Sequence, residues 1–344
     1  MALVAALLAA GCTHGGDDGD EPSRALTLVR GEIEAPYVAG DRLGSKRLAA
    51  PISTTLIANL APAAVPDPSG ERVAYNSWRG NRPLVRVAGD RDTVVAEGAY
   101  APAWRRDGAL AYVQALEPEL PGPEAIRGYR GHVVVRGRLE TAPRRWTEAA
   151  GRYVVAAWAD ERLLAYRITT GWPELLVLDA PGRVRVLARD AALVAVAPDG
   201  SRVFVSTYGA TPPLVRVLDV EGGRELARRT VPAVRWLVEA GSWRDGHVAA
   251  GSSVGVALFR VSERGIWVEQ LLRLDRVGFT TGVFEPQLDE RGRVTAWGEL
   301  ESRPRQTFAG AAVVECDLAE RRCVHGPELS SAVAPRLVYD PSRP

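Results

Sequence analysis

The sequence predicts an all-β fold in which four-stranded sheets repeat around a closed ring, a β-propeller. Three observations predict it: one strand–turn–strand unit occurs twice without a gap, its turn recurs along the chain, and the two chain ends each supply part of one sheet. The chain has 344 residues, 46% of them hydrophobic and 25% charged, so it can bury a sizeable core. All-β folds of this length commonly form one domain.

The clearest copy of the unit covers residues 196–223. It reads as an Asp199-Gly200 turn, an apolar strand, a proline-marked loop, a second alternating strand and a Gly222-Gly223 turn. Residues 67–87 match residues 197–217 at a constant offset, and the run Pro-Leu-Val-Arg-Val is identical in both copies. Such self-similarity is typical of a repeat architecture.

The turn recurs in weaker forms, which set the number of repeats. Its anchors fall at positions 70, 108, 161, 200, 246, 292 and 343. Their mean spacing of about 46 residues is close to the roughly 40–50 residues of one propeller blade. The spacing predicts seven four-stranded blades. Six is the alternative, because the anchor at 161 lacks glycine and follows the longest gap.

The two chain ends are expected to complete one blade. The last anchor leaves room for one strand at 335–339, and three short strands are predicted at 25–30, 35–39 and 47–52. Pairing the N- and C-terminal strands in one blade would close the ring and remove unpaired sheet edges. Residues 25–344 are therefore expected to be a single propeller domain.

The N-terminal segment is predicted to be a targeting segment and not part of the folded domain. Residues 1–11 contain an apolar run too short to span a bilayer, as expected of a signal peptide, and the polar tract 12–24 is expected to be a flexible tether. The run ending in Gly11-Cys12 resembles the bacterial lipoprotein box. The resemblance implies a lipid on Cys12 and an anchor on the outer side of the bacterial cell membrane. A buried or redox-active Cys12 is the alternative.

Two units carry a second resemblance. Pro-Ala-Trp-x-x-Asp-Gly-x-Leu-Ala-Tyr at 102–112 and Ala-Pro-Asp-Gly-Ser-Arg-Val-Phe at 197–204 resemble the WD40-like repeats of TolB-type β-propellers. The resemblance covers about residues 60–340. It implies an extracytoplasmic binding scaffold, and it implies fold more firmly than function. This chain has no room for the α/β domain of TolB proper, so a role in the Tol–Pal system is not expected.

No catalytic, cofactor or metal site is predicted. Residues 251–255 match the Gly-x-Ser-x-Gly pattern of serine hydrolases, but that motif needs a following helix and residues 254–259 read as a strand. The four histidines, His14, His132, His247 and His325, lack partners at metal-ligand spacing. The net charge of +1 shows no overall excess of basic residues of the kind that binds nucleic acid.

Cys316 and Cys323 are predicted to form a disulfide. They flank a six-residue turn between two short apolar segments, so strand pairing would place the sulfurs opposite one another. A secretory address favours the oxidised state. Redox catalysis is the alternative, although the spacing exceeds Cys-x-x-Cys.

Five of the nine tryptophans recur at or near the repeat anchors: Trp78, Trp104, Trp158, Trp243 and Trp297. Recurrence at one place in a blade favours packing between blades. An aromatic platform for a sugar is the alternative.

The function predicted is that of a non-catalytic, lipid-anchored β-propeller, a monomer, that binds a protein or an envelope glycan through one face of the ring or its channel. One alternative is a propeller enzyme, a glycosidase or lyase with carboxylates gathered at the channel mouth, because such groups converge only in space. The other is a carbohydrate-binding module. The proline-rich insertion at 117–124 is a candidate binding loop or a plain connection.

Overall fold

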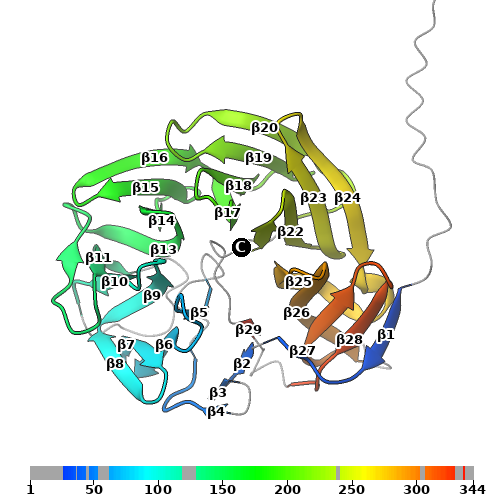
Figure 1. Cartoon of the computed structure of the whole chain (residues 1–344), viewed down its shortest axis with the longest axis horizontal. Coiled ribbons are helices and arrows are strands. Elements are labelled where there is room, and N and C mark those ends of the chain that lie inside the picture. Colours follow the sequence, from blue (N-terminus) through cyan, green and yellow to red (C-terminus); the bar gives the residue numbers. More distant parts are fainter. Residues whose placement is uncertain are drawn as a thin grey trace, which may run out of the picture.

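The computed structural model describes residues 26–35, 37–43, 46–52, 62–117, 129–237, 241–302, 307–329 and 336–337. The chain is an all-β propeller, with sheets arranged radially around a central axis (Figure 1). Within these residues the one helical element is the 3₁₀ turn η1 (Leu274–Arg276). None of their helices is long and apolar enough to span a membrane.

Three sheets contain four antiparallel strands in chain order. They are β5 (Ala64–Pro66), β6 (Val73–Arg79), β7 (Arg82–Ala88) and β8 (Asp92–Glu97); β17 (Ala191–Val196), β18 (Arg202–Thr207), β19 (Leu214–Asp219) and β20 (Glu225–Thr230); and β21 (Ser242–Arg244), β22 (His247–Ser252), β23 (Gly255–Ser262) and β24 (Gly265–Arg273). β17 is buried at every position, whereas most of β20 is exposed. Burial decreases outward because the blades converge at the axis (Figure 1).

The next strands form one eight-stranded sheet. It contains β9 (Ala99–Trp104), β10 (Leu110–Ala115), β11 (Arg130–Arg136), β12 (Arg144–Arg145), β13 (Gly151–Ala159), β14 (Arg162–Arg167), β15 (Glu174–Ala180) and β16 (Arg183–Arg189). Only two residue pairs, Arg130 with Arg152 and Gly131 with Gly151, join β11 to β13. The sheets therefore do not divide the chain into seven separate units, and the number of blades stays a prediction.

One sheet combines strands from both parts of the chain. Its order is β29 (Arg336–Leu337), β2 (Tyr37–Ala39), β3 (Arg42–Leu43) and β4 (Lys46–Arg47). It touches the β5–β8 sheet, where Ala49 N donates to the Asp92 carboxylate (2.7 Å), and the β25–β28 strands, where Leu337 N donates to Glu285 (3.1 Å). One C-terminal and three N-terminal strands thus share a sheet, while closure of a seven-bladed ring stays a prediction.

The strand predicted at 25–30 does not belong to that sheet. β1 (Thr27–Arg30) instead pairs in parallel with β28 (Arg322–His325), at the edge of a five-stranded sheet that continues through β27 (Thr307–Asp317), β26 (Arg293–Ser302) and β25 (Phe279–Leu288). Leu26 and Leu28 pack against the apolar cluster of that sheet. This burial, together with the covered edge of β28, explains the position of β1.

The prediction of a strand at 47–52 was also wrong. The tight turn at Gly40 and Asp41 leads at once into β3, and β4 ends at Arg47. Leu48 N then donates to Asp41 O (2.7 Å) and Ile52 N to Gly40 O (3.0 Å), so these residues fold back on the turn.

Buried tryptophans pack between neighbouring blades, as predicted. Trp104, Trp158 and Trp243 are each 2% exposed. An arginine from the preceding unit lies over each indole at 5.0–5.4 Å; the pairs are Arg72 over Trp104, Arg105 over Trp158 and Arg202 over Trp243. The cation adds to the apolar burial and links one turn to the next blade. These three tryptophans are therefore part of the scaffold and not a sugar platform.

The predicted disulfide is present. Cys316 on β27 lies directly opposite Cys323 on β28, and both residues are buried. The bridge lies next to β1, because Leu28 is in register with Cys323.

Aspartates hold the recurring turns. Asp67 accepts hydrogen bonds from Ser69 Oγ and from Arg72 N and Nε, and Asp107 accepts from Arg105 and from Ala109 N. Burial raises the pKa of Asp67, but these hydrogen bonds outweigh it, so its pKa lies below the ordinary value. The hydrogen bonds from Arg105 lower the pKa of Asp107. The pKa values of Asp199 and Asp289 are lowered as well.

We expect the free energy of unfolding to fall as the pH drops below about 4. A carboxyl group whose pKa is depressed in the folded state stabilises the fold above its unfolded pKa, and this contribution is lost as the pH falls through the folded pKa. Urea unfolding between pH 6 and pH 3 measures the effect. The variant Asp107→Asn should have a smaller pH dependence, and an unchanged slope would contradict the assignment to the turns.

Candidate functional site

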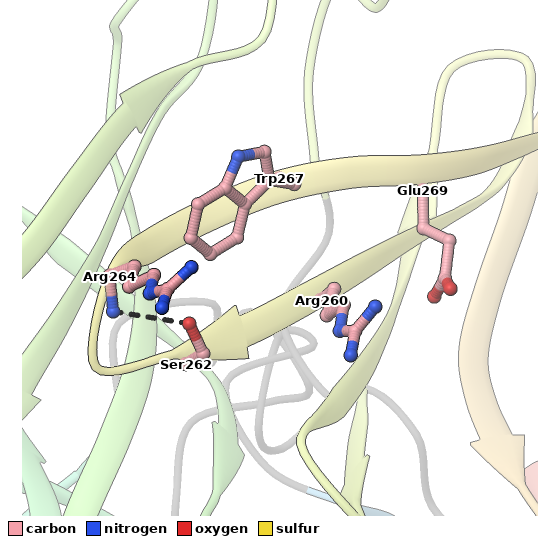
Figure 2. A pocket seen from close by; sticks show the side chains of 5 residues that line it. All are labelled: Arg260, Ser262, Arg264, Trp267 and Glu269. Atoms are coloured by element: carbon pink, nitrogen blue, oxygen red, sulfur yellow. Dashed lines mark hydrogen bonds between the residues drawn. The ribbon is translucent and has the colours of Figure 1, made fainter.

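A surface groove lies on the outer hairpin of the β21–β24 sheet. It is lined by Arg260, Ser262, Arg264, Trp267 and Glu269, and we call it the β23–β24 groove (Figure 2). Its volume is about 550 Å³, at the size of a small-ligand pocket. All five side chains belong to the strands and to the turn that joins them, so the groove is built on a regular element.

The pleat of the hairpin places these side chains outward. Val261 and Ile266 are paired across the hairpin and buried in the cluster shared with the β17–β20 sheet. Arg260 is paired with Trp267, and both are exposed. Because neighbouring residues of a strand point to opposite faces, burial of Val261 and Ile266 turns Arg260 and Trp267 to the other side.

The two guanidinium groups of the groove have no ion-pair partner within the described part of the chain. The backbone N of Arg264 donates to Ser262 Oγ (3.1 Å), which fixes the turn (Figure 2). The one carboxylate, Glu269, already lies 3.3 Å from His247 Nε2. The groove therefore offers two unpaired positive charges beside an indole that is 39% exposed.

This set of groups can bind a ligand that is both anionic and partly apolar. Arg guanidinium binds carboxylates in a bidentate manner, and indole offers an apolar face next to it. Acid–base cleavage of a glycoside uses two carboxyl groups, and the groove has one. Among the described residues no group of three or more His, Cys, Asp or Glu side chains could hold a metal ion.

The serine motif at 251–255 forms a turn between strands. Ser252 Oγ donates to Gly255 O (2.8 Å), and Ser253 Oγ accepts from Arg235 N (3.0 Å). β23 begins at Gly255, where a nucleophile motif would require a helix. The interpretation as a turn is confirmed.

The buried carboxylate of Glu285, on β25, accepts hydrogen bonds from the scaffold. Glu285 is 6% exposed and accepts hydrogen bonds from Trp297 Nε1 (3.0 Å) and Leu337 N (3.1 Å). These bonds connect β25 to β26 and to β29. Glu285 thus connects two sheets through these hydrogen bonds.

The other predicted site residues lie elsewhere. Cys12 and residues 118–124 of the insertion lie outside the described residues, and the Cys316–Cys323 bridge is part of the β27–β28 hairpin. None of the groove residues was predicted from the sequence. A usable signal was the position of Trp267, which is not at a repeat anchor and so lacks the packing role of the anchor tryptophans.

Comparison with solved structures finds proteins whose fold is similar to that of this chain. The chain matches TolB from Acinetobacter baumannii (14% identity, TM-score 0.42, 69% of this chain and 63% of that one) and a putative TolB from Agrobacterium tumefaciens (12%, 0.45, 72% and 92%). It also matches an oligogalacturonate lyase in complex with manganese (12%, 0.49, 69% and 73%). Less than two thirds of the Acinetobacter chain is thus covered. No protein-family model and no curated protein matches the sequence. At these identities no function is transferred.

Proposed function

We propose that this chain is a non-catalytic, lipid-anchored β-propeller on the outer side of a bacterial cell membrane, which binds an acidic segment of a protein partner in the β23–β24 groove. The observation that carries the proposal is the pair of unpaired guanidinium groups, Arg260 and Arg264, beside the exposed indole of Trp267. The groove is the site, in place of the channel or the loops that the repeat pattern favoured.

The composition of the groove supports a protein partner. Tryptophan and arginine are enriched among the residues that dominate binding energy at protein interfaces. An extended acidic segment can place carboxylates on Arg260 and Arg264 and an apolar side chain on Trp267 (Figure 2). The carboxylate of Glu269 already contacts His247 Nε2 at 3.3 Å.

The double variant Arg260→Gln/Arg264→Gln is expected to bind a synthetic peptide of alternating Glu and Leu at least about tenfold more weakly, because each lost charge-assisted hydrogen bond contributes roughly 1.5–3 kcal/mol. Isothermal titration calorimetry measures the affinity, and added salt should weaken wild-type binding. Arg183→Gln, which changes an exposed arginine on β16, is the matched control. Equal affinity of the double variant and this control would refute the proposal. Preference for an oligogalacturonate over the peptide would assign the groove to an acidic envelope polymer instead.

The lipid anchor is tested separately. Because Cys12 is the residue that the lipoprotein box would modify, Cys12→Ala is expected to move the protein from the membrane fraction to the soluble extracytoplasmic fraction. Fractionation with metabolic labelling by a fatty acid measures both properties. Serine at position 12 serves as an isosteric control and should behave like alanine. Unchanged membrane association and labelling of Cys12→Ala would remove the anchor from the proposal.

A further inference from the structure

A stacked pair of aromatic rings stands on a different part of the ring from the groove. Trp172, in the loop between β14 and β15, lies on Tyr208, in the loop between β18 and β19; the ring centroids are 5.3 Å apart and the planes differ by 5°. More than half of the Trp172 side chain (52%) remains exposed, although it is one of the largest apolar groups. We call this pair the aromatic platform. It joins the β14–β15 loop to the β18–β19 loop of the β17–β20 sheet.

Both loops hold the platform in place. Thr169 Oγ1 donates to Trp172 O (3.1 Å) and accepts from Gly171 N (3.2 Å), while Tyr208 N donates to Asp190 O (2.8 Å). Gly209, at φ +69°, lies so close that a Cβ there would be 3.2 Å from the indole. Because the ring is fixed before any ligand arrives, binding to it loses little conformational entropy.

Charged groups form a row across the strands on both sides of the Trp172 loop and on β16. Arg167, Glu174 and Arg189 are cross-strand neighbours on β14, β15 and β16. Glu174 is the first residue of β15 and follows Trp172 by two positions. Glu174 contacts both Arg167 (2.5 Å) and Arg189 (3.4 Å). The row carries one net positive charge, and the Arg189 side chain is 76% exposed, so it keeps donors that face solvent.

The surroundings favour a sugar over a protein partner. Thr169, Thr170 and Gly171, which precede the indole, are exposed and are polar or lack a side chain. A stable protein interface buries about 800 Å² on each partner around an apolar centre. The exposed indole face alone is instead close in size to a single pyranose ring, whose axial C–H groups form an apolar face and whose equatorial hydroxyls point outward.

We propose that the aromatic platform binds a β-linked, gluco-configured glycan, with one sugar ring stacked on Trp172 and its hydroxyls hydrogen-bonded by Arg189. This site is independent of the acidic segment proposed for the β23–β24 groove. Tyr208 acts as a positioning residue, because it holds the indole from its other face.

Titration of the whole chain with cellohexaose tests the proposal. We expect wild-type binding at millimolar concentrations or tighter, and a loss of about tenfold or more in Trp172→Ala, because the indole supplies both the apolar area that the sugar buries and the stacking contact. Trp172→Phe should retain part of the affinity. Trp267→Ala, an exposed tryptophan of the groove, should leave cellohexaose binding unchanged while weakening the acidic peptide.

Two results would overturn the proposal. One is no binding of cellohexaose by the wild-type chain at millimolar concentrations. The other is equal affinity of wild type and Trp172→Ala when circular dichroism shows both folded. A β-linked galactose hexamer, whose axial 4-hydroxyl interrupts one face of each ring, should bind more weakly than cellohexaose. Equal binding of the two hexamers would contradict stacking on a gluco-configured ring.

Discussion

Trp158→Ala is expected to lower the free energy of unfolding by about 3–5 kcal/mol, the range for removal of a buried aromatic side chain. Trp158 is 2% exposed, and its Nε1 donates to Ala103 O (3.1 Å) on β9. Trp146 packs edge-on against it at 5.5 Å, and Arg105 lies over its ring. The substitution leaves a cavity between two units and removes the hydrogen bond to Ala103 O. Urea unfolding followed by circular dichroism measures the loss.

The control for this variant is Trp172→Ala, which removes the same side chain from an exposed loop. Surface substitutions usually change stability by no more than about 0.5 kcal/mol. Trp158→Phe should lie between the two, because it keeps apolar volume but loses the hydrogen bond. If Trp158→Ala and Trp172→Ala were equally stable, the buried tryptophans would not stabilise the packing between blades.

Gly200→Ala is expected to destabilise the chain by about 3 kcal/mol, from a left-handed backbone (about 1–2 kcal/mol) and overpacking (about 1–3 kcal/mol). Gly200 has φ +69°. A Cβ there would lie 2.5 Å from Asp160 N and 2.8 Å from Ala159 C, both backbone atoms of the preceding unit. Backbone cannot rotate away as a flexible side chain can, so the two turns would be pushed apart. Thermal and urea unfolding measure the change.

Gly108→Ala separates the two causes. Gly108 occupies the equivalent turn at φ +86°, and no atom lies within 4 Å of its Cβ position. Alanine there should cost only the conformational part, about 1–2 kcal/mol. Equal losses at both glycines would show that the contact with Asp160 and Ala159 does not constrain the fold.

Local turn chemistry made much of the fold predictable from the sequence. The Asp-Gly turns, the alternating strands and the regular spacing each follow from short-range geometry, and the buried anchor tryptophans follow from their recurrence. β1 was assigned to the wrong sheet because the pattern of apolar and polar residues in these four positions is compatible with the edges of several sheets. Its place beside β28 is decided by Leu28 packing near Cys323, about 300 residues away.

The candidate site was harder to predict for a physical reason. Arg260 and Arg264 do not differ by type from the many arginines of this chain, in which Lys46 is the sole lysine. What distinguishes them among the described residues is their place in one groove beside Trp267, without a carboxylate partner, whereas Arg86 and Arg293 are paired at 2.9 Å or less. Pairing is a property of the folded surface, and so is the exposure of Trp267.

The order of strand pairing also sets when the protein can become complete during its synthesis. Thr27 pairs with Arg322 and Tyr37 with Leu337, so β1 and one edge of β2 must wait for partners translated about 300 residues later, while the other edge of β2 pairs with β3. At roughly 5–20 residues per second, this delay lasts about 15–60 s. The units from β5 onward can pair with neighbours as they emerge, whereas the first strands stay without their partners until nearly the whole chain exists. Until then these strand edges stay exposed, and any chaperone that holds the growing chain would need to cover them.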